Sequence, residues 1–175
     1  MTIRTLLVGA MLTASIGYSQ VAPAADAAQT RIAREVRHEI LMLPYFGVLD
    51  NIAYNIQGST VTLVGQVTRP TLKDDAERNV KDIEGVEAVR NQIEVLPLSP
   101  NDDRLRIALY RAIYNYGALQ RYAMPVIKPI RIVVRNGNVT LEGAVDSEGD
   151  KNLINVRAHG VSGVFRITNN LRVEK

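Results

Sequence analysis

A set of arginine and tyrosine side chains between residues 106 and 122 has the composition of a surface that contacts phosphate groups and apolar partners. Guanidinium groups pair with phosphates, and tyrosine rings sit at headgroup depth in a bilayer. Projected onto a helix, most of these side chains share the face opposite the apolar stripe. They could instead pack against the first half of the chain or a second copy of it, or remain solvated. The set comprises Arg106, Ile107, Tyr110, Arg111, Tyr114 and, further along the chain, Tyr122.

Composition excludes most catalytic and metal-binding chemistries. The 175-residue sequence contains no cysteine, which excludes disulfides, thiolate metal clusters and cysteine nucleophiles. His38 and His159 are the only histidines, and neither joins acidic residues at metal-ligand spacing. No motif brings together a nucleophile, a base and an orienting group. We therefore expect a protein that is not an enzyme and that needs neither a metal nor a cofactor.

The elements that carry these side chains belong to an internal repeat. The segment GSTVTLVGQV at residues 58–67 returns as NGNVTLEGAV at residues 136–145, 78 positions later. The match continues without a gap to Val95 and Val173. Upstream the best spacing is 73 positions, so the second copy carries five extra residues within the segment QRYAMPVIKPI. Such insertions usually lie in loops, and loops commonly carry binding function.

Each copy predicts the order helix, strand, strand, helix, strand. Apolar residues recur at helical spacing in residues 32–43 and 105–116, and at strand spacing in residues 52–63 and 130–141. The dipeptide Asn136-Gly137 predicts a type I′ hairpin. We expect an α+β fold, a two-layer sandwich of two tandem αββαβ units, each with a three-stranded mixed sheet covered on one face by two helices. The last strand of each unit is expected to run parallel to the second strand and beside the first.

Four glycines recur at matched positions of the two copies and are expected to be structural. Gly65 and Gly143 predict a bulge or a close approach of a helix, where a side chain would clash. Gly85 and Gly163 predict the turns that lead into the last strands.

The N-terminal residues have the features of an export signal. Arg4 supplies a positive charge, residues 6–16 are largely apolar, and small residues with A-x-A spacing follow. We expect cleavage after Ala24 or Ala27 and a periplasmic mature protein, for which nucleic acid is not an expected partner. The expected divisions are a signal peptide at residues 1–27, a first domain at 28–95, a linker at 96–101 and a second domain at 102–175.

Charge differs between the two copies. Residues 28–98 contain 8 Lys and Arg against 10 Asp and Glu, a net charge of −2. Residues 99–175 contain 12 against 7, a net charge of +5. An anionic partner is therefore expected to contact the second copy.

The pattern G-x-V-x-L-x-G-x-V, followed by an amphipathic helix and by G-V-x-x-V-x-N-x-[LI], resembles the BON domain (bacterial OsmY and nodulation) family. Asn136 departs from the pattern, because it stands where the first glycine is expected. The resemblance implies a periplasmic or outer-membrane-associated protein, of the kind linked to envelope stress and osmotic shock, without catalytic activity. It implies binding to phospholipid or to envelope partners. The basic charge of the second copy favours anionic phospholipid, whereas an exposed apolar face would instead favour chaperone-like binding of envelope proteins.

Overall fold

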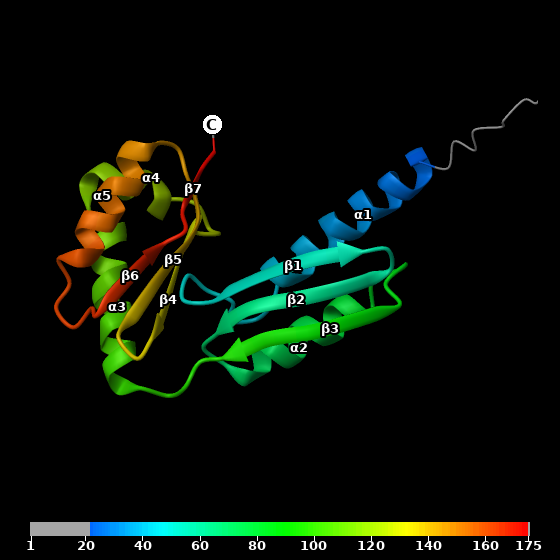
Figure 1. The fold of residues 1–175 in the computed structure, drawn as a ribbon, viewed down its shortest axis with the longest axis horizontal. Coiled ribbons are helices and arrows are strands. Elements are labelled where there is room, and N and C mark those ends of the chain that lie inside the picture. The colour runs from blue at the N-terminus through cyan, green and yellow to red at the C-terminus, as the bar shows by residue number, and fades with distance from the viewer. Residues whose placement is uncertain (1–21, 175) are drawn as a thin grey trace, which may run out of the picture.

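The computed structural model describes residues 22–174, so most of the expected signal peptide lies outside the described residues. Two tandem units follow one another along the chain (Figure 1). The first unit contains α1 (Ala22–Leu41), β1 (Asn51–Gln57), β2 (Thr60–Val67), α2 (Pro70–Lys81) and β3 (Ala88–Val95). The second unit contains α3 (Pro100–Tyr114), the short 3₁₀ helix η1 (Gly117–Leu119), α4 (Gln120–Ala123), β4 (Ile130–Arg135), β5 (Asn138–Val145), α5 (Glu148–His159), β6 (Arg166–Asn169) and β7 (Arg172–Val173). No helix within residues 22–174 is both long and apolar enough to cross a membrane.

The sheets confirm the expected α+β fold and correct the position of the last strand. In the first unit β1 pairs antiparallel with β2, and β3 pairs parallel with β2. In the second unit β4, β5 and β6 repeat this order, and β7 continues the parallel pairing with β5. The last strand was expected beside the first, which is wrong. The hairpin occupies one edge of the middle strand, so the returning chain pairs with the open edge on the other side.

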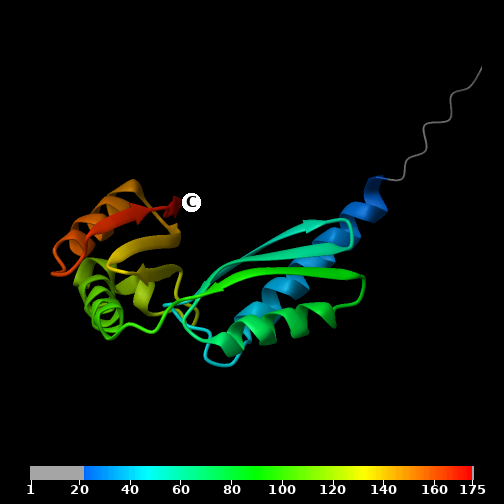
Figure 2. The same cartoon turned by 60° about the horizontal axis from the view of Figure 1, so that its bottom comes forward.

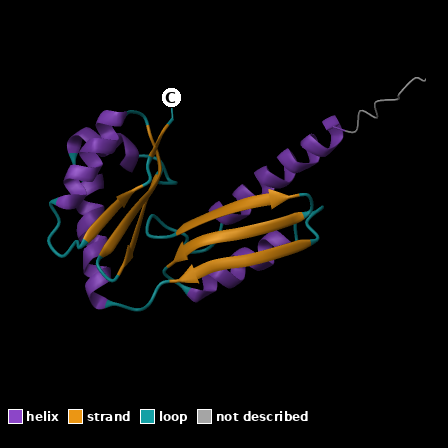
Figure 3. Ribbon diagram, in the orientation of Figure 1, coloured by secondary structure: helices purple, strands orange, loops and turns teal. Residues whose placement is uncertain are grey.

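Each sheet is covered on one face by two helices, as the apolar pattern predicts (Figures 2 and 3). In the first unit Val36 of α1, Ala76 of α2 and Leu63 of β2 are buried in one cluster. In the second unit Leu109, Ile154 and Leu141 hold the corresponding positions. The apolar positions that recur in the sequence therefore build two separate cores with the same layers.

The glycines in the middle strands allow a close backbone approach. Gly65 has a φ of 127°, and a Cβ placed there would lie 2.1 Å from the carbonyl oxygen of Asn51. Gly143 has a φ of 116°, and a Cβ there would lie 1.9 Å from the carbonyl oxygen of Pro129. The predicted clash is confirmed, but its partner is the backbone at the start of the first strand and not a helix.

The turns of the hairpins and last strands also follow local sequence. Asn136 and Gly137 have φ values of 51° and 74°, which confirms the predicted type I′ geometry. Gly85 and Gly163 have φ values of 89° and 94° in the turns before the last strands. These turns fix where each last strand begins.

A repeated asparagine ties each last strand to the helix before it. The Asn91 side chain accepts a hydrogen bond from the backbone N–H two residues later and donates to the carbonyl oxygen of Lys73, at 3.1 and 2.9 Å. Asn169 makes the equivalent bonds, the second to the carbonyl oxygen of Lys151, both at 3.2 Å. The repeated N-x-[LI] pattern thus serves the fold in both units.

Candidate functional site

Three of the side chains predicted to face the surface belong to the interior of the second unit. Arg106, Tyr114 and Tyr122 retain only 3%, 2% and 4% of their accessible surface, so their predicted exposure is wrong. Arg106 Nη2 donates to the carbonyl oxygen of Val134, and the Tyr114 hydroxyl donates to that of Ile130, both at 2.6 Å. Both acceptors lie on the edge strand β4, which packs beside α3. These side chains therefore cap a sheet edge, and burial raises the pKa of Tyr114.

The other residues of the predicted set remain on or near the surface of α3. Ile107 is 49% exposed and Arg111 is exposed. Tyr110 is half-buried, because its ring packs against the buried ring of Tyr114 with centroids 4.9 Å apart. What is left of the predicted surface is therefore one apolar and one basic side chain beside a partly covered tyrosine.

Tyr122 lies at the centre of a polar cluster that anchors the insertion. Its hydroxyl donates to Asp150 Oδ2 at 2.8 Å and accepts from the backbone N–H of Asp146 at 2.8 Å. Arg121 forms an ion pair with Asp150 and stacks over the Tyr122 ring. Burial raises the pKa of Asp150, but hydrogen bonds from Ser147 and Tyr122 and the charge of Arg121 outweigh it, so the net pKa is lowered.

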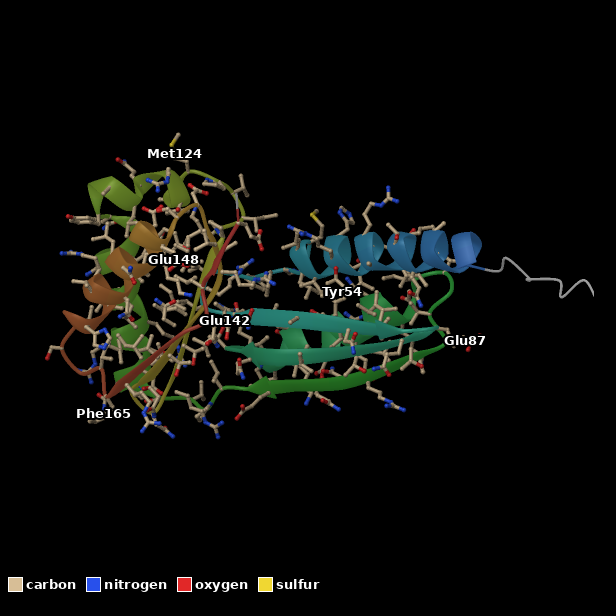
Figure 4. All side chains as sticks on the ribbon, turned by 45° about the horizontal axis from the view of Figure 1, so that its top comes forward. Tyr54, Glu87, Met124, Glu142, Glu148 and Phe165 are labelled. Atoms are coloured by element: carbon tan, nitrogen blue, oxygen red, sulfur yellow. The ribbon has the colours of Figure 1, made fainter. Side chains whose placement is uncertain are left out.

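The insertion continues from this anchor into an exposed apolar segment, residues 124–127, here called the apolar loop. Met124 is 80% exposed, Val126 98% and Ile127 48%. Lys128 Nζ donates to the carbonyl oxygens of Ala123 and Pro125, both at 2.7 Å, which closes the base of the loop. Figure 4 shows Met124 and Phe165 at opposite ends of the second unit. The five-residue insertion has therefore placed apolar side chains in solvent.

The two units contact each other directly through the segment that precedes β1. The backbone N–H of Ile132 donates to the carbonyl oxygen of Val48 at 2.8 Å. Arg131 Nη1 donates to the carbonyl oxygen of Gly47 at 2.8 Å, and its guanidinium lies 4.6 Å from the ring centroid of Phe46. The first unit thus forms a backbone hydrogen bond with the free edge of β4 through Val48, and its Phe46 ring stacks on Arg131.

A groove of about 450 Å³, here called the inter-unit groove, runs along this junction. Its apolar lining includes Leu41, Phe46 and Ile52 of the first unit and Ile127 of the apolar loop. Its cations come from both units, and Glu174 is its only carboxylate within the described part of the chain. The cationic side chains are Arg37, Lys128, Arg131 and Arg172.

Comparison with known families agrees with this architecture. A family model for the BON domain matches residues 28–97 and again residues 117–175. The chain belongs to the BON domain family. The two matches fall within the first and second units, here called the first and second BON domains, and α3 precedes the second match. BON domains are non-catalytic binding modules often associated with membranes or the cell envelope.

No curated protein matches the sequence. Among solved structures, the chain is similar to CdsD, a structural protein of the type III secretion system of Chlamydia trachomatis, with 12% identity and a TM-score of 0.31 over 83% of this chain and 94% of that one. The C-terminal domain of CdsD gives 12% identity and a TM-score of 0.28 over 81% of this chain and 96% of that one. Scores this low carry no argument about function.

Arg131 is an incompletely compensated charge at the contact between the two BON domains. It is half-buried, and burial lowers its pKa. It forms no ion pair with any carboxylate in residues 22–174, although Asp50 lies near enough to act on it electrostatically. A guanidinium that is partly removed from water without a counter-ion favours an anionic ligand.

A second groove, of about 660 Å³, lies between α1 and α2 of the first BON domain. Arg34 and His38 line it together with four carboxylates, those of Glu35, Glu39, Asp82 and Glu84, so negative charge predominates in its lining. Across the described residues, no group of three or more histidines, aspartates or glutamates is placed to hold a metal ion. The inter-unit groove is therefore the more favourable site for an anion.

Sequence reasoning missed the cations of the inter-unit groove because they come from segments far apart in the chain. Arg37 lies in α1, Arg131 in β4 and Arg172 in β7. No local pattern links them, and only the packing of the two BON domains brings them together. The single signal in the sequence was the insertion, whose last part supplies Ile127 and Lys128 to the groove.

Proposed function

We propose that the protein is a non-enzymatic module of the cell envelope that is exported to the periplasm and associates with anionic phospholipid surfaces through its second BON domain. It would there support envelope integrity under stress. The observation that carries this proposal is the apolar loop, in which Met124 and Val126 are 80% and 98% exposed. Neighbouring apolar side chains held in solvent mark contact sites for membranes or partners.

The expected energies favour a peripheral and reversible association. Burial of a side chain of this size contributes about 1.5–3 kcal/mol when it is complete, and the depth of the headgroup region allows only part of that. Each basic residue near an anionic surface adds about 1 kcal/mol. Because residues 99–175 carry a net charge of +5, the association should weaken as salt concentration rises.

The test is co-sedimentation of the purified mature protein with phosphatidylcholine vesicles and with vesicles that also contain phosphatidylglycerol, at low and high salt. We expect binding to the anionic vesicles alone and a loss of binding at high salt. The variant Met124→Ser/Val126→Ser should weaken binding about ten-fold or more, since both side chains would enter the membrane.

A matched control removes two equally exposed apolar side chains from elsewhere in the chain. Leu98 and Phe165 are 94% and 84% exposed, so Leu98→Ser/Phe165→Ser should bind vesicles as the unmodified protein does. The variant Ile107→Ser/Arg111→Ser tests what remains of the α3 surface. If that variant alone loses binding, α3 and not the apolar loop is the contact; if no vesicle is bound, the proposal is wrong.

A periplasmic protein-interaction or chaperone-like role is the second candidate, and the exposed ring of Phe165 favours it. Phe165 packs on Gly137, where an added Cβ would lie 2.2 Å from the ring, yet 84% of the residue remains in solvent. Docking of a partner on such an apolar ring should survive or strengthen with salt, unlike binding to an anionic membrane. Salt dependence therefore separates the two functions.

A further inference from the structure

We propose that the inter-unit groove binds the phosphate group of a phospholipid, with Arg131 as its central contact. This inference extends the proposed function and rests on it in one respect, namely that a membrane supplies the phospholipid. The groove itself can be tested without any membrane. Two properties carry the inference, namely the unused hydrogen-bonding and charge capacity of the cations and the apolar character of the remaining walls.

Arg131 is held in position with most of its donors free. Its Nη1 donates to the carbonyl oxygen of Gly47 and its plane stacks on Phe46, which together fix the guanidinium at the junction. Its remaining N–H groups donate to no acceptor within residues 22–174. A guanidinium presents five donors in a planar fork that matches two oxygens of a phosphate group. The position of this fork is therefore set before a ligand arrives.

Two carboxylates close to Arg131, those of Asp50 and Glu142, accept hydrogen bonds from other groups. Asp50 accepts hydrogen bonds from the backbone N–H of Gly47 at 3.0 Å and from the backbone N–H and hydroxyl of Thr68 at 2.7 and 2.8 Å. Glu142 lies opposite Arg131 across the β4–β5 pair and accepts from Asn170 at 2.7 Å. Figure 4 shows Glu142 at the junction of the two domains. Neither carboxylate forms an ion pair with Arg131.

The other cations of the groove are also under-compensated. The side chain of Arg37 is exposed and makes no hydrogen bond or ion pair with any described residue. Arg172 is paired only with Glu174, at 3.4 Å and with both side chains mostly in solvent. Lys128 donates to two carbonyl oxygens and meets no carboxylate in this part of the chain. Four cations face one carboxylate, which favours a ligand with negative charge.

The apolar lining selects among anions. Leu41, Phe46 and Ile52 line the groove together with Ile127 of the apolar loop. A free phosphate ion would satisfy the cations but leave these walls in contact with water. A phospholipid supplies an anionic phosphate beside an apolar body, so it complements both parts of the lining. Because Ile127 belongs to both the loop and the groove, a lipid bound there would lie next to the segment proposed to enter the membrane.

The experiment measures binding of dihexanoyl phosphatidylglycerol, below its micelle concentration, to the mature protein by titration calorimetry and by the NMR signal of the Arg131 side chain. Inorganic phosphate and dihexanoyl phosphatidylcholine are measured in parallel. We expect saturable binding of the anionic lipid, a shift of the Arg131 signal, and binding of inorganic phosphate at least about ten-fold weaker. Equal affinity for inorganic phosphate would overturn the assignment to a phospholipid.

Variants separate the groove from general attraction to a basic protein. Arg131→Gln should abolish binding, but it also removes contacts between the domains and could alter their packing. Arg37→Gln/Arg172→Gln leaves those contacts intact and should weaken binding about ten-fold or more. Arg90→Gln/Arg166→Gln changes the net charge equally at two exposed positions outside the groove and should bind normally. Equal losses in the two double variants would refute a specific site.

The apolar-loop variant Met124→Ser/Val126→Ser distinguishes this inference from the proposed function. It should keep its affinity for the soluble lipid while losing vesicle binding. If vesicles are not bound but the soluble lipid is, the proposed function fails and the groove assignment stands. If vesicles are bound but the soluble lipid is not, the groove assignment fails alone.

Discussion

The two BON domains share one backbone design but hold equivalent positions with different side chains. At the end of the second strand, the backbone N–H of Thr68 in the first domain donates to Asp50 at 2.7 Å. The equivalent N–H, that of Asp146, donates to the Tyr122 hydroxyl at 2.8 Å. The same orphan amide is therefore satisfied by a carboxylate in one domain and by a phenol from the insertion in the other. The fold requires a hydrogen-bond acceptor for this backbone N–H, and each domain supplies a different one.

Buried polar groups are concentrated in the second domain. Its interior contains Asp102, Arg106 and Asp150, whereas Asp50 is the only buried charged residue in the described part of the first. The position 78 residues before Asp150 is Leu72, which is fully buried. A position that is apolar in the first domain is thus a buried carboxylate in the second. The buried charges of the second domain accompany two features of its own, a sheet edge capped by Arg106 and an insertion anchored by Asp150.

The largest effect should come from a feature that the two domains share. Gly65→Ala and Gly143→Ala would each place a Cβ about 2 Å from a backbone carbonyl oxygen at a φ that L-residues rarely adopt. We expect each substitution to destabilise its own domain by about 3 kcal/mol or more. Urea denaturation gives the loss, and hydrogen exchange shows which domain opens.

The control for these substitutions is Gly117→Ala, because a Cβ at Gly117 meets no atom within 4 Å. It should leave the unfolding midpoint nearly unchanged. If Gly65→Ala and Gly143→Ala differed strongly from each other, the two hairpins would not be equivalent, and the comparison between the domains would break at the level of the backbone.

A smaller effect should be confined to the second domain. Tyr122→Phe keeps the ring but removes the acceptor for Asp146 N–H and the donor to Asp150, at a cost of about 1–3 kcal/mol. The measurement is the urea midpoint together with amide exchange at Asp146. Tyr116→Phe serves as the matched control, since the Tyr116 ring stacks with Arg157 and its hydroxyl makes no hydrogen bond with the described residues. Equal losses in both variants would contradict the proposed role of the cluster.

Most of the fold could be predicted from the sequence, because turns and buried strand faces depend on residues close together in the chain. The pair Asn136-Gly137 predicts its turn from two residues alone, and the alternation around Leu63 and Leu141 predicts which face each strand buries. The predicted neighbour of the last strand was wrong, because a helical crossover fixes the direction in which that strand runs but does not decide whether it pairs with the first or the second strand. That choice follows from which edge the hairpin leaves open.

The candidate site was predictable only in part. A helix projection places Tyr114 opposite the apolar stripe and Arg106 at the flank of that face, but it contains no information about the edge of β4 that lies beside α3. Arginine and tyrosine are long enough to reach such an edge with their polar ends while their stems pack in the core. The contact between Arg131 and Gly47 joins residues 84 positions apart, so no local pattern could indicate the inter-unit groove.

The smallest expected effect is a pH dependence of stability in the second domain that comes from Asp150. It tests the difference between the two domains at the level of one buried carboxylate. The net pKa of Asp150 is lowered from its ordinary value of 3.8, so the carboxylate contributes stability that is fully present above that value. This contribution is lost as the pH falls through the lower pKa of the folded state. The stability difference between the unmodified protein and Asp150→Asn should therefore be constant near neutral pH and shrink as the pH drops below 3.8. Urea midpoints between about pH 7 and pH 2.5 measure it, with Asp74→Asn as the control that removes an exposed carboxylate of the first domain. A stability difference that stayed constant down to the lowest pH would contradict this prediction. It would mean that protonation of the Asp150 carboxylate does not change the stability of the domain, so that Asp150 acts through packing and hydrogen bonds and not through its charge.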